Sequence, residues 1–293
     1  MKLTSIISAI LGMALSITAA AQDQPYDGIY KWETFEFDGL QRDYSIFLPA
    51  GLPEDAPLVV YLHGYGSDGR PKSDLLCQLA GKEKFAVCIP AAALDPQGKH
   101  GWNVRYTFQE DYEVDDIEFV CALTRHVQEK YGLSRSNAFC TGHSNGGEMC
   151  YLLAYRKPGF FNALAPLSGL TMEWMYKELV PTAPVALMEI HGTEDRTSEW
   201  GGDLSDDYWG HYISVPLAVA NWAVAARCTH EITTTLPRRS RKACKVVLHR
   251  YVAEDNGGIE VQLYEVIGRG HSLSTDDFDY PQAVWDFFKK YLK

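Results

Sequence analysis

The residues of this chain that could do chemistry begin with Gly142-His143-Ser144-Asn145-Gly146, a serine with a glycine two positions away on each side. An apolar run at 138–140 precedes this pentapeptide, and a helix-compatible run at 149–155 follows it. A strand, a tight G-x-S-x-G turn and a helix make a nucleophile elbow, which exposes a serine hydroxyl above a sheet. Gly142 and Gly146 carry no Cβ and allow the close backbone contacts of such a turn. Ser144 is therefore a candidate nucleophile, although a glycine-rich surface turn fits the same pattern.

A serine nucleophile needs a base to take its proton and an acid to orient that base. Asp195 follows an apolar run at 185–190, and His271 follows another at 261–266. Both residues are thus expected at the carboxyl ends of strands, where doubly wound sheets bind their ligands. The chain order Ser, Asp, His is the order found in α/β-hydrolases. We predict that Ser144 is the nucleophile, Asp195 the orienting acid and His271 the base.

Other residues could take the roles of acid and base. Glu194 is chemically able to replace Asp195, and only the family resemblance given below favours Asp195. His63 and His191 stand just before glycines at predicted strand ends, so we expect them to shape those turns. The other histidines considered lie in a predicted strand or around a helix (His211, His230 and His249).

A tetrahedral intermediate also needs two backbone N–H groups aimed at its negative oxygen. The residue after the nucleophile supplies one of them in this architecture, which is Asn145 here. The loop after the apolar run 58–62 contains His63-Gly64-Tyr65 and is expected to supply the other. We predict Tyr65 as that donor.

Strands and helices alternate along nearly the whole chain. A hairpin is predicted at 33–37 and 44–48 around Asp38-Gly39, and Asp115-Asp116 are expected to begin a helix rather than to act in catalysis. Further strands are predicted at 58–62, 85–89, 161–167, 185–190, 245–251 and 261–266, and helices at 75–80, 115–131, 213–226 and 281–292. This alternation predicts an α/β fold with a mostly parallel central sheet and helices on both faces.

Two irregular, aromatic-rich segments, 91–112 and 197–211, follow predicted strands and are expected near the site. Their aromatic faces could stack on a phenolic acyl group or on sugar rings, so we predict four substrate-binding residues: Trp102, Trp200, Tyr208 and Trp209.

The composition is that of a globular protein, and the formal net charge is −11. Nucleic acids and anionic membrane surfaces favour Lys and Arg, so neither is expected as a partner. Cysteines and histidines show no metal-ligand spacing, and no metal or cofactor is expected. The oligomeric state is not predicted.

The first 21 residues have the features of a secretory signal peptide: Lys2, an apolar stretch at 3–17 and Ala19-Ala20-Ala21 before the expected cleavage. A membrane anchor is the competing reading, but the apolar stretch is short for a span. We therefore predict a secreted or periplasmic protein whose residues 22–293 form one catalytic domain.

Seven cysteines occur in the chain, and an oxidising compartment permits disulfides. Cys77 with Cys88 and Cys228 with Cys244 are the predicted pairs, because each pair sits on neighbouring segments. Cys140 and Cys150 flank the elbow on predicted buried elements and are expected to be free thiols.

The motifs together resemble one family. They are 62-LHGYGS-67, 114-VDDIEFV-120, 141-TGHSNGG-147, 167-LSGL-170, 190-IHGTED-195, 200-WGG-202 and 270-GHS-272. In this order they are similar to the polyhydroxybutyrate depolymerase-like esterases, a group that includes the feruloyl and acetylxylan esterases of carbohydrate esterase family 1. The resemblance covers most of residues 40 to 285. It implies an α/β-hydrolase fold with Ser144, Asp195 and His271 as the triad. Two departures concern the substrate site: Leu273-Ser274 replace the Trp-Pro often found after the family's histidine, and the Trp102 region matches only loosely.

The function expected from these residues and this resemblance is serine-dependent hydrolysis of carboxylic esters. A feruloyl (hydroxycinnamoyl) esterase acting on plant cell-wall polysaccharide, such as arabinoxylan, is the first expectation. An acetylxylan esterase comes next, and a polyhydroxyalkanoate depolymerase third. A non-catalytic carbohydrate-binding protein is the alternative from another class, since folds can outlive functions.

Overall fold

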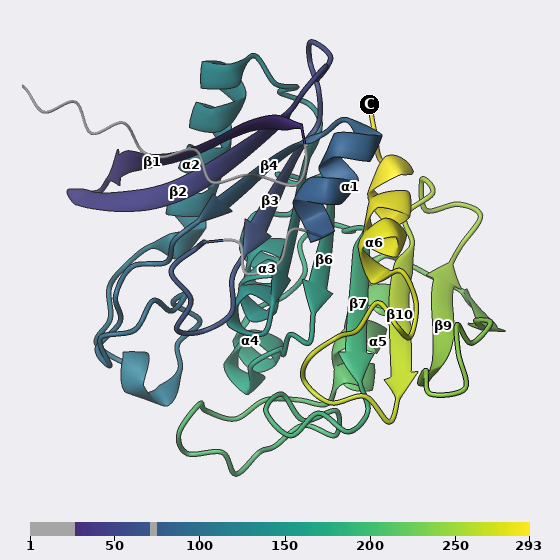
Figure 1. Ribbon diagram of the computed structural model, residues 1–293. Coiled ribbons are helices and arrows are strands. Elements are labelled where there is room, and N and C mark those ends of the chain that lie inside the picture. The colour runs from purple at the N-terminus through teal and green to yellow at the C-terminus, as the bar shows by residue number, and fades with distance from the viewer. Residues whose placement is uncertain (1–26, 71–74) are drawn as a thin grey trace, which may run out of the picture.

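The structure is a computed structural model that describes residues 27–70 and 75–293 (Figure 1). The predicted signal peptide lies outside the described residues. The strands are β1 (Gly28–Phe37), β2 (Leu40–Pro49), β3 (Leu58–Leu62), β4 (Ala86–Pro90), β5 (Ala138–His143), β6 (Ala163–Leu167), β7 (Leu187–Gly192), β8 (His230–Thr235), β9 (Lys245–Val252) and β10 (Val261–Ile267). The helices are α1 (Leu75–Glu83), α2 (Asp116–Tyr131), α3 (Asn145–Arg156), α4 (Glu173–Glu178), α5 (Val215–Ala225) and α6 (Tyr280–Lys289), with a short 3₁₀ turn, η1, at Thr107–Gln109.

These strands form one ten-stranded sheet in the order β1-β2-β4-β3-β5-β6-β7-β10-β9-β8. The central strands are parallel; in sheet order they are β4, β3, β5, β6, β7 and β10. The pair β1–β2 at one side and the pair β9–β8 at the other join the sheet in antiparallel fashion. The predicted α/β-hydrolase fold, with a mostly parallel sheet, is confirmed. The chain passes from β3 to β4 on one side and returns to β5 on the other side of β3. This reversal opens a crevice beyond the carboxyl ends of β3 and β5, which is where doubly wound sheets bind ligands.

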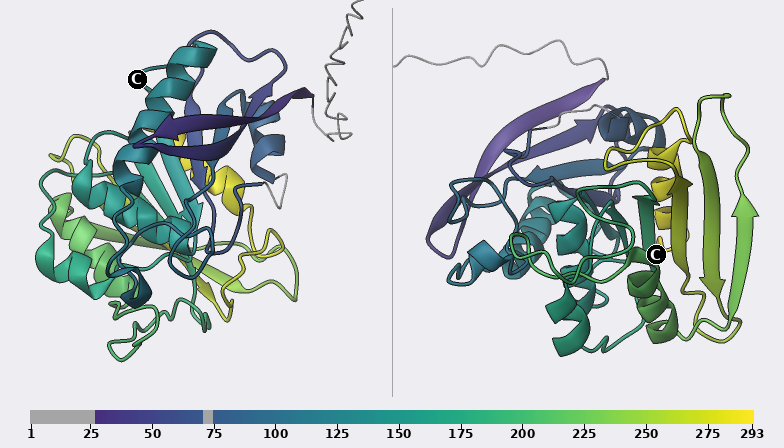
Figure 2. Two further views of the ribbon diagram at one scale, coloured as in Figure 1. Left: turned by 90° about the vertical axis from the view of Figure 1, so that its left-hand side faces the viewer. Right: turned by 90° about the horizontal axis from the view of Figure 1, so that it is seen from below.

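Helices cover both faces of the sheet (Figures 1 and 2). One core lies between the sheet and α2, α3 and α5, and the other lies between the sheet and α1 and α6. Alternation within β3 explains the two cores, because Leu58, Val60 and Leu62 face the first and Val59 faces the second. A strand buried on both faces must be a continuous apolar run, and β3 is one.

The predicted hairpin is confirmed and is longer than expected, with Phe37 paired to Leu40 around the turn. Two elements were not predicted. Strand β8 is exposed along its whole length and has a polar sequence, His230-Glu-Ile-Thr-Thr-Thr235, so it lacks the apolar signal of the central strands. Helix α4 is only six residues long, too short to show a helical period.

The two predicted disulfides are wrong. Cys88 is a free thiol on the α2–α3 face of the sheet, whereas Cys77 of α1 packs on the opposite face. Cys228 and Cys244 are also free, because they lie at opposite ends of the antiparallel pair β8–β9. The prediction that Cys140 and Cys150 are free thiols is confirmed; both are buried, with their sulfurs 3.7 Å apart.

Among residues 27–70 and 75–293, no helix has the length and apolar character needed to cross a membrane. The same residues contain no group of histidine, cysteine and carboxylate side chains arranged to hold a metal ion.

Candidate active site

Ser144 stands in a strained turn between β5 and α3. Its φ of 56° and ψ of −123° are unusual for a residue with a side chain, as expected of a nucleophile elbow. The flanking glycines are required by space: a Cβ on Gly142 would lie 2.5 Å from the Gly146 carbonyl oxygen, and one on Gly146 would lie 2.1 Å from that of Leu62. The backbone N–H of Ser144 donates to the Leu167 carbonyl at 2.9 Å, which ties the turn to β6.

His271 and Asp195 meet at the carboxyl ends of β10 and β7. The Nδ1 atom of His271 lies 2.8 Å from Oδ2 of Asp195, so Nδ1–H donates to the carboxylate and leaves Nε2 for the serine side. The other carboxylate oxygen accepts the backbone N–H groups of Thr197 at 2.8 Å and Ser198 at 2.9 Å. Burial alone would raise the pKa of Asp195, but these hydrogen bonds outweigh it and lower the pKa below its ordinary value.

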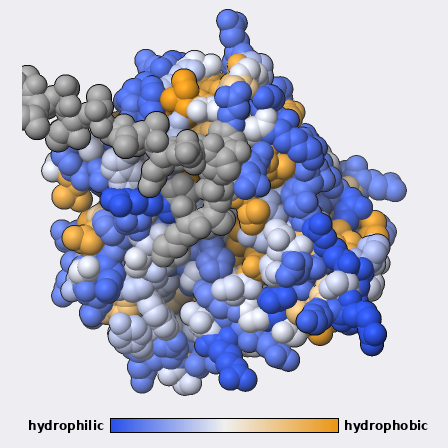
Figure 3. Space-filling view, viewed as in Figure 1, coloured by the Kyte–Doolittle hydropathy of each residue, from blue (hydrophilic) through white to orange (hydrophobic). Residues whose placement is uncertain are grey.

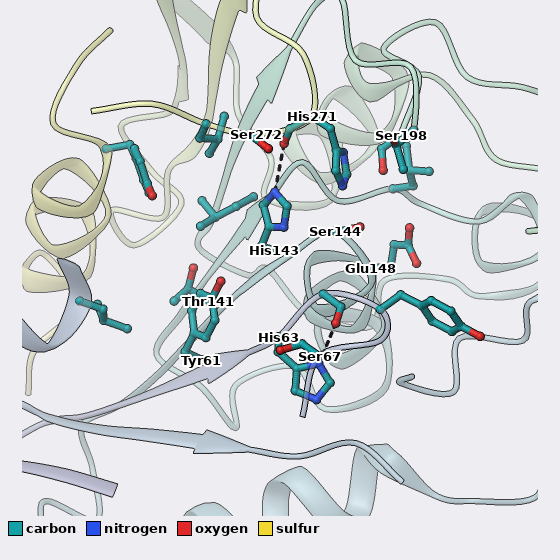
Figure 4. Close-up of a pocket in the computed structure, with 18 of the residues that line it drawn as sticks. Tyr61, His63, Ser67, Thr141, His143, Ser144, Glu148, Ser198, His271 and Ser272 are labelled. Atoms are coloured by element: carbon teal, nitrogen blue, oxygen red, sulfur yellow. Dashed lines mark hydrogen bonds between the residues drawn. The ribbon is translucent and has the colours of Figure 1, made fainter. Parts of the chain in front are cut away.

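The backbone of His271 is also held in place. Its carbonyl oxygen accepts from Nε2 of His143 at 3.0 Å and from the Ser168 hydroxyl at 3.1 Å. In Figure 4 the imidazole of His271 points from one wall of the cavity toward Ser144, with His143 beside it. The carboxyl ends of β5 and β6 therefore hold the backbone of the segment that carries the imidazole.

A second histidine lies behind Asp195. His191 is fully buried, and its Nε2 lies 2.8 Å from the Ser198 carbonyl and 3.5 Å from Asp195 Oδ2. Its Nδ1 lies 2.9 Å from the buried carboxyl of Glu189, whose pKa burial raises to about 7. As expected from its position, His191 supports the turn that carries Asp195 and does not face the serine.

The loop after β3 contacts the elbow directly. A Cβ built on Gly64 would lie 3.5 Å from the Cβ of Ser144. His63 shapes this loop: its Nδ1–H donates to the Gly64 carbonyl at 2.8 Å and its Nε2 accepts the N–H of Ala92 at 2.9 Å. Burial lowers the pKa of His63 to about 4, so the ring is neutral, and the Ala92 N–H occupies the one ring nitrogen that could accept the serine proton.

The two residues expected to bind the oxyanion lie on either side of Ser144. Asn145 is the first residue of α3, and the first N–H groups of a helix have no acceptor within it. Tyr65 follows Gly64, and its side chain is anchored by a hydrogen bond from its hydroxyl to Asp95 at 2.7 Å. Both residues thus belong to segments that border the serine.

Trp102 does not bind substrate as predicted. It is fully buried (0% exposed) and lies outside the cavity lining. Its indole N–H donates to the His63 carbonyl at 2.9 Å, and its backbone N–H donates to the Asn145 side chain at 2.7 Å. The sequence showed an aromatic residue in a loop but could not show that the loop folds inward; in the structure Trp102 joins the two segments expected to form the oxyanion hole.

A buried carboxyl completes this network. Glu148, one turn along α3, accepts a hydrogen bond from the Tyr106 hydroxyl. The Asn145 side-chain amide donates to the same hydroxyl at 3.0 Å and to the Glu148 carboxyl at 3.4 Å. Burial raises the pKa of Glu148 to about 7, although the hydrogen bonds from Tyr106 and Asn145 act to lower it. Glu148 also faces the cavity beside Ser144 (Figure 4).

The cavity that contains Ser144 and His271 has a volume of about 650 Å³. Of the four predicted substrate-binding residues, Trp209 alone lines it. Trp200 packs against the core near His191. Tyr208 is exposed, with its ring tilted against Phe108 and edge-on to Trp209; neither residue lines the cavity. The wall on the Trp209 side is largely aromatic and apolar (Tyr65, Tyr106, Leu170, Met172, Trp209 and Tyr212).

Several residues of the site were not predicted from the sequence. Tyr106 and Tyr212 were missed because single aromatic residues in an irregular segment carry no signal of direction. Glu148 and Glu189 were missed because they sit within otherwise apolar elements. A carboxylate inside a buried strand or helix is rare, and this is the one sequence signal that could have identified the two glutamates.

No protein-family model matches the chain. Among curated proteins, a bifunctional acetylxylan esterase/xylanase of Neocallimastix patriciarum is 24% identical over 86% of this chain and 34% of its own length. A probable feruloyl esterase C of Aspergillus niger is 26% identical over 61% of this chain and 64% of its own length. The matches thus span from about a third to under two thirds of these relatives.

Solved structures confirm the fold. An acetyl xylan esterase from Aspergillus awamori superposes with a TM-score of 0.64 at 16% identity, covering 89% of this chain and 99% of that one. Feruloyl esterase and poly(3-hydroxyalkanoate) depolymerase are also names found among the sequence relatives. The resemblance proposed from the motifs is confirmed.

Proposed function

We propose that this protein is a serine esterase in which Ser144 is the nucleophile, His271 the base and Asp195 the acid that orients it. The supporting observation is the arrangement at the carboxyl edge of the sheet. A serine in a strained elbow and an imidazole that is hydrogen-bonded to a carboxylate line the same cavity, whose wall is partly aromatic. The sequence relatives are named as ester hydrolases, which agrees with this chemistry.

The proposed reaction has two halves. Nε2 of His271 takes the Ser144 proton while the serine oxygen bonds to the ester carbonyl carbon, and Asp195 holds the imidazole in the required tautomer. The N–H groups of Tyr65 and Asn145 stabilise the negative oxygen. The alcohol leaves with the proton from His271, and a water activated by the same imidazole then releases the acid. No metal or cofactor enters either half.

The proposed substrate is a feruloyl (hydroxycinnamoyl) ester of plant cell-wall polysaccharide. Trp209, Tyr65 and Tyr212 give the cavity an aromatic wall on which a phenolic ring could stack, and about 650 Å³ is ample for an acyl group of that size. Acetylxylan is the second candidate, because the relative that matches the larger share of this chain is named an acetylxylan esterase/xylanase. Hydrolysis of polyhydroxyalkanoate is the third.

Residues 22–293 are proposed to act as one catalytic domain after export to the periplasm or beyond, with cleavage after about Ala21. Sequencing the amino terminus of the exported protein tests this part of the proposal. A mature chain that begins near Gln22 supports it, and a chain that keeps Met1 contradicts it.

The first experiment compares the wild-type protein with S144A on methyl ferulate, acetylated xylan and a short hydroxybutyrate oligomer. Loss of the nucleophile should lower kcat by about 10⁴-fold or more and abolish labelling by a fluorophosphonate. Ser136→Ala, an exposed serine before β5, is the matched control and should keep full activity. Retention of most activity by S144A would refute the mechanism, and a wild-type protein that neither labels nor hydrolyses would favour a non-catalytic carbohydrate-binding role.

A further inference from the structure

The loop between β8 and β9 is strongly basic in an acidic protein. Five cations occur within residues 238–245, although the formal net charge of the chain is −11. No acidic residue occurs between Glu231 and Glu254 to offset them. The five cations are Arg238, Arg239, Arg241, Lys242 and Lys245; we call them the basic loop.

All five side chains of the basic loop are exposed, and none forms an ion pair with the part of the chain that the structure describes. Cations elsewhere are often neutralised, as Arg42 is by Asp116 and Arg250 by Glu260. The charge of the basic loop is therefore available to a ligand. Figure 3 shows strongly hydrophilic side chains projecting at the lower right, where Figure 1 places the lower ends of β9 and β10.

The basic loop lies on the same edge of the sheet as the candidate active site. Lys245 pairs with Ile267, so the loop stands at the carboxyl end of β10, next to the segment that carries His271. The Arg239 guanidinium donates to the Thr275 carbonyl at 3.0 Å, and the Cys244 N–H donates to Asp277 at 2.7 Å.

The segment that the basic loop contacts is also a wall of the cavity. Thr275 follows Ser272 and Leu273, which line the cavity together with His271. Asp277 is buried and already paired with Arg269, with Nε 2.6 Å from its carboxylate, so it does not neutralise the loop. The basic loop thus packs against the segment that continues from this wall of the cavity.

We propose that the basic loop binds the carboxylates of an acidic polysaccharide, the uronic acid groups of a cell-wall polymer whose ester enters the cavity. The inference rests on the proposed function and specifies its substrate class. Arginine guanidinium groups match carboxylates in shape and charge, and charges at the rim of a cleft raise the local concentration of an oppositely charged polymer. Nucleic acids and anionic membranes carry a higher density of negative charge than a polysaccharide with scattered carboxylates, so the acidic remainder of the protein repels them more strongly.

The test measures binding to a deacylated xylan that carries glucuronic acid and to the same xylan with its carboxyl groups reduced to alcohols. The variant R238Q/R241Q/K242Q removes three cations and keeps Arg239, which holds Thr275. The control R135Q/R227Q/K293Q removes the same charge from exposed positions; Arg135 and Lys293 adjoin Asn137 before β5, and Arg227 precedes β8, all toward the opposite edge of the sheet. Hydrolysis of methyl ferulate is measured in all three proteins.

We expect the wild-type protein and the control to bind the acidic xylan more tightly than the reduced one, with a preference that falls as salt rises. The loop variant should bind the acidic xylan about tenfold more weakly, as three exposed charge contacts predict. It should bind the reduced xylan unchanged.

The inference is overturned if the wild type binds both xylans equally, or if the control variant loses as much affinity for the acidic xylan as the loop variant does. Binding of DNA or of anionic lipid vesicles as tightly as acidic xylan would also overturn it. Hydrolysis of methyl ferulate separates the two proposals. If the wild type and the loop variant hydrolyse methyl ferulate equally while the wild type binds the acidic and the reduced xylan with equal affinity, the inference fails and the esterase proposal stands.

Discussion

Trp102 is the residue whose role changes most when its contacts are considered. Its aromatic type and loop position suggest substrate stacking, yet its ring is buried and donates to the carbonyl of His63. Its backbone meanwhile holds the Asn145 side chain. A residue that ties together two backbone segments can position the N–H groups of both, so we expect Trp102 to act on kcat through geometry and not through direct contact with substrate.

The substitution W102F keeps most of the ring and removes the indole N–H. It should lower kcat for methyl ferulate by about tenfold to 100-fold, because small displacements at a reacting centre are costly, and leave KM nearly unchanged. Trp222→Phe is the matched control: Trp222 is equally buried, and its indole N–H has no hydrogen-bond partner in the described part of the chain. The W222F variant should lose a comparable amount of its free energy of unfolding while its kcat stays at the wild-type value. Equal kcat losses in both variants would show that Trp102 has only a packing role.

At the scale of elements, α2 is attached to the sheet through one buried ion pair. Asp115 caps the helix, accepting the N–H of Glu118 at 3.0 Å, and so behaves as a helix-start residue as predicted. Asp116 turns inward, 2.6 Å from Arg42 of β2, and also accepts the N–H of Asn103 at 2.7 Å. Arg42 in turn donates to the carbonyl of Ala91. The pair therefore joins a helix, an outer strand and the irregular segment that contains Trp102.

Removing the charge of Asp116 leaves a buried guanidinium without its counterion. We predict that D116N lowers the free energy of unfolding by about 3–5 kcal/mol, measured by urea denaturation at neutral pH. The neighbouring D115N is the control, because asparagine caps helices about as well as aspartate and should cost little. A loss below about 1 kcal/mol in D116N would mean that the ion pair contributes little to the attachment of α2.

At the scale of the whole molecule, buried carboxyls make stability depend on pH. Burial raises the pKa of Glu148 to about 7 from an ordinary value of 4.5. A raised pKa means that the folded protein binds a proton that the unfolded chain has released. The contribution of Glu148 is thus fully present below about pH 4.5 and is lost as the pH rises through about 7.

The variant E148Q removes this titration and keeps a hydrogen-bonding group. Between pH 4.5 and pH 8, the free energy of unfolding of the wild type should fall relative to that of E148Q by up to about 3 kcal/mol. Urea denaturation at several pH values measures this difference, and Glu189, present in both proteins, cancels from it. Glu129→Gln, at the exposed end of α2, should run parallel to the wild type. Parallel curves for E148Q and the wild type would contradict the predicted titration.

The distribution of charge is also a property of the whole molecule. A net charge of −11 by itself suits a neutral substrate, but a net charge is an average over the whole chain. By pairing β9 with β10, the fold places the basic loop beside the segment that carries His271. The electrostatic potential there is more positive than the average over the surface.

The sequence by itself determined the sheet, the elbow and its family resemblance, because these depend on local signals. Continuous apolar runs identify strands buried on both faces, and Gly142 and Gly146 are required wherever Ser144 makes such a turn. The candidate triad could be named because its members follow strands whose carboxyl ends share one edge. Its assignment remains a proposal, supported by the hydrogen bond between His271 and Asp195.

Only the tertiary structure decided which loop residues face the cavity and which face the core. Trp102 and Trp209 are alike in sequence terms, yet Trp102 is buried behind the loop after β3 and Trp209 lines the cavity. The cysteine pairing failed for the same reason, since Cys77 and Cys88 are near in sequence but on opposite faces of the sheet. Irregular segments have no period, so the direction of each side chain is set by contacts with distant parts of the chain.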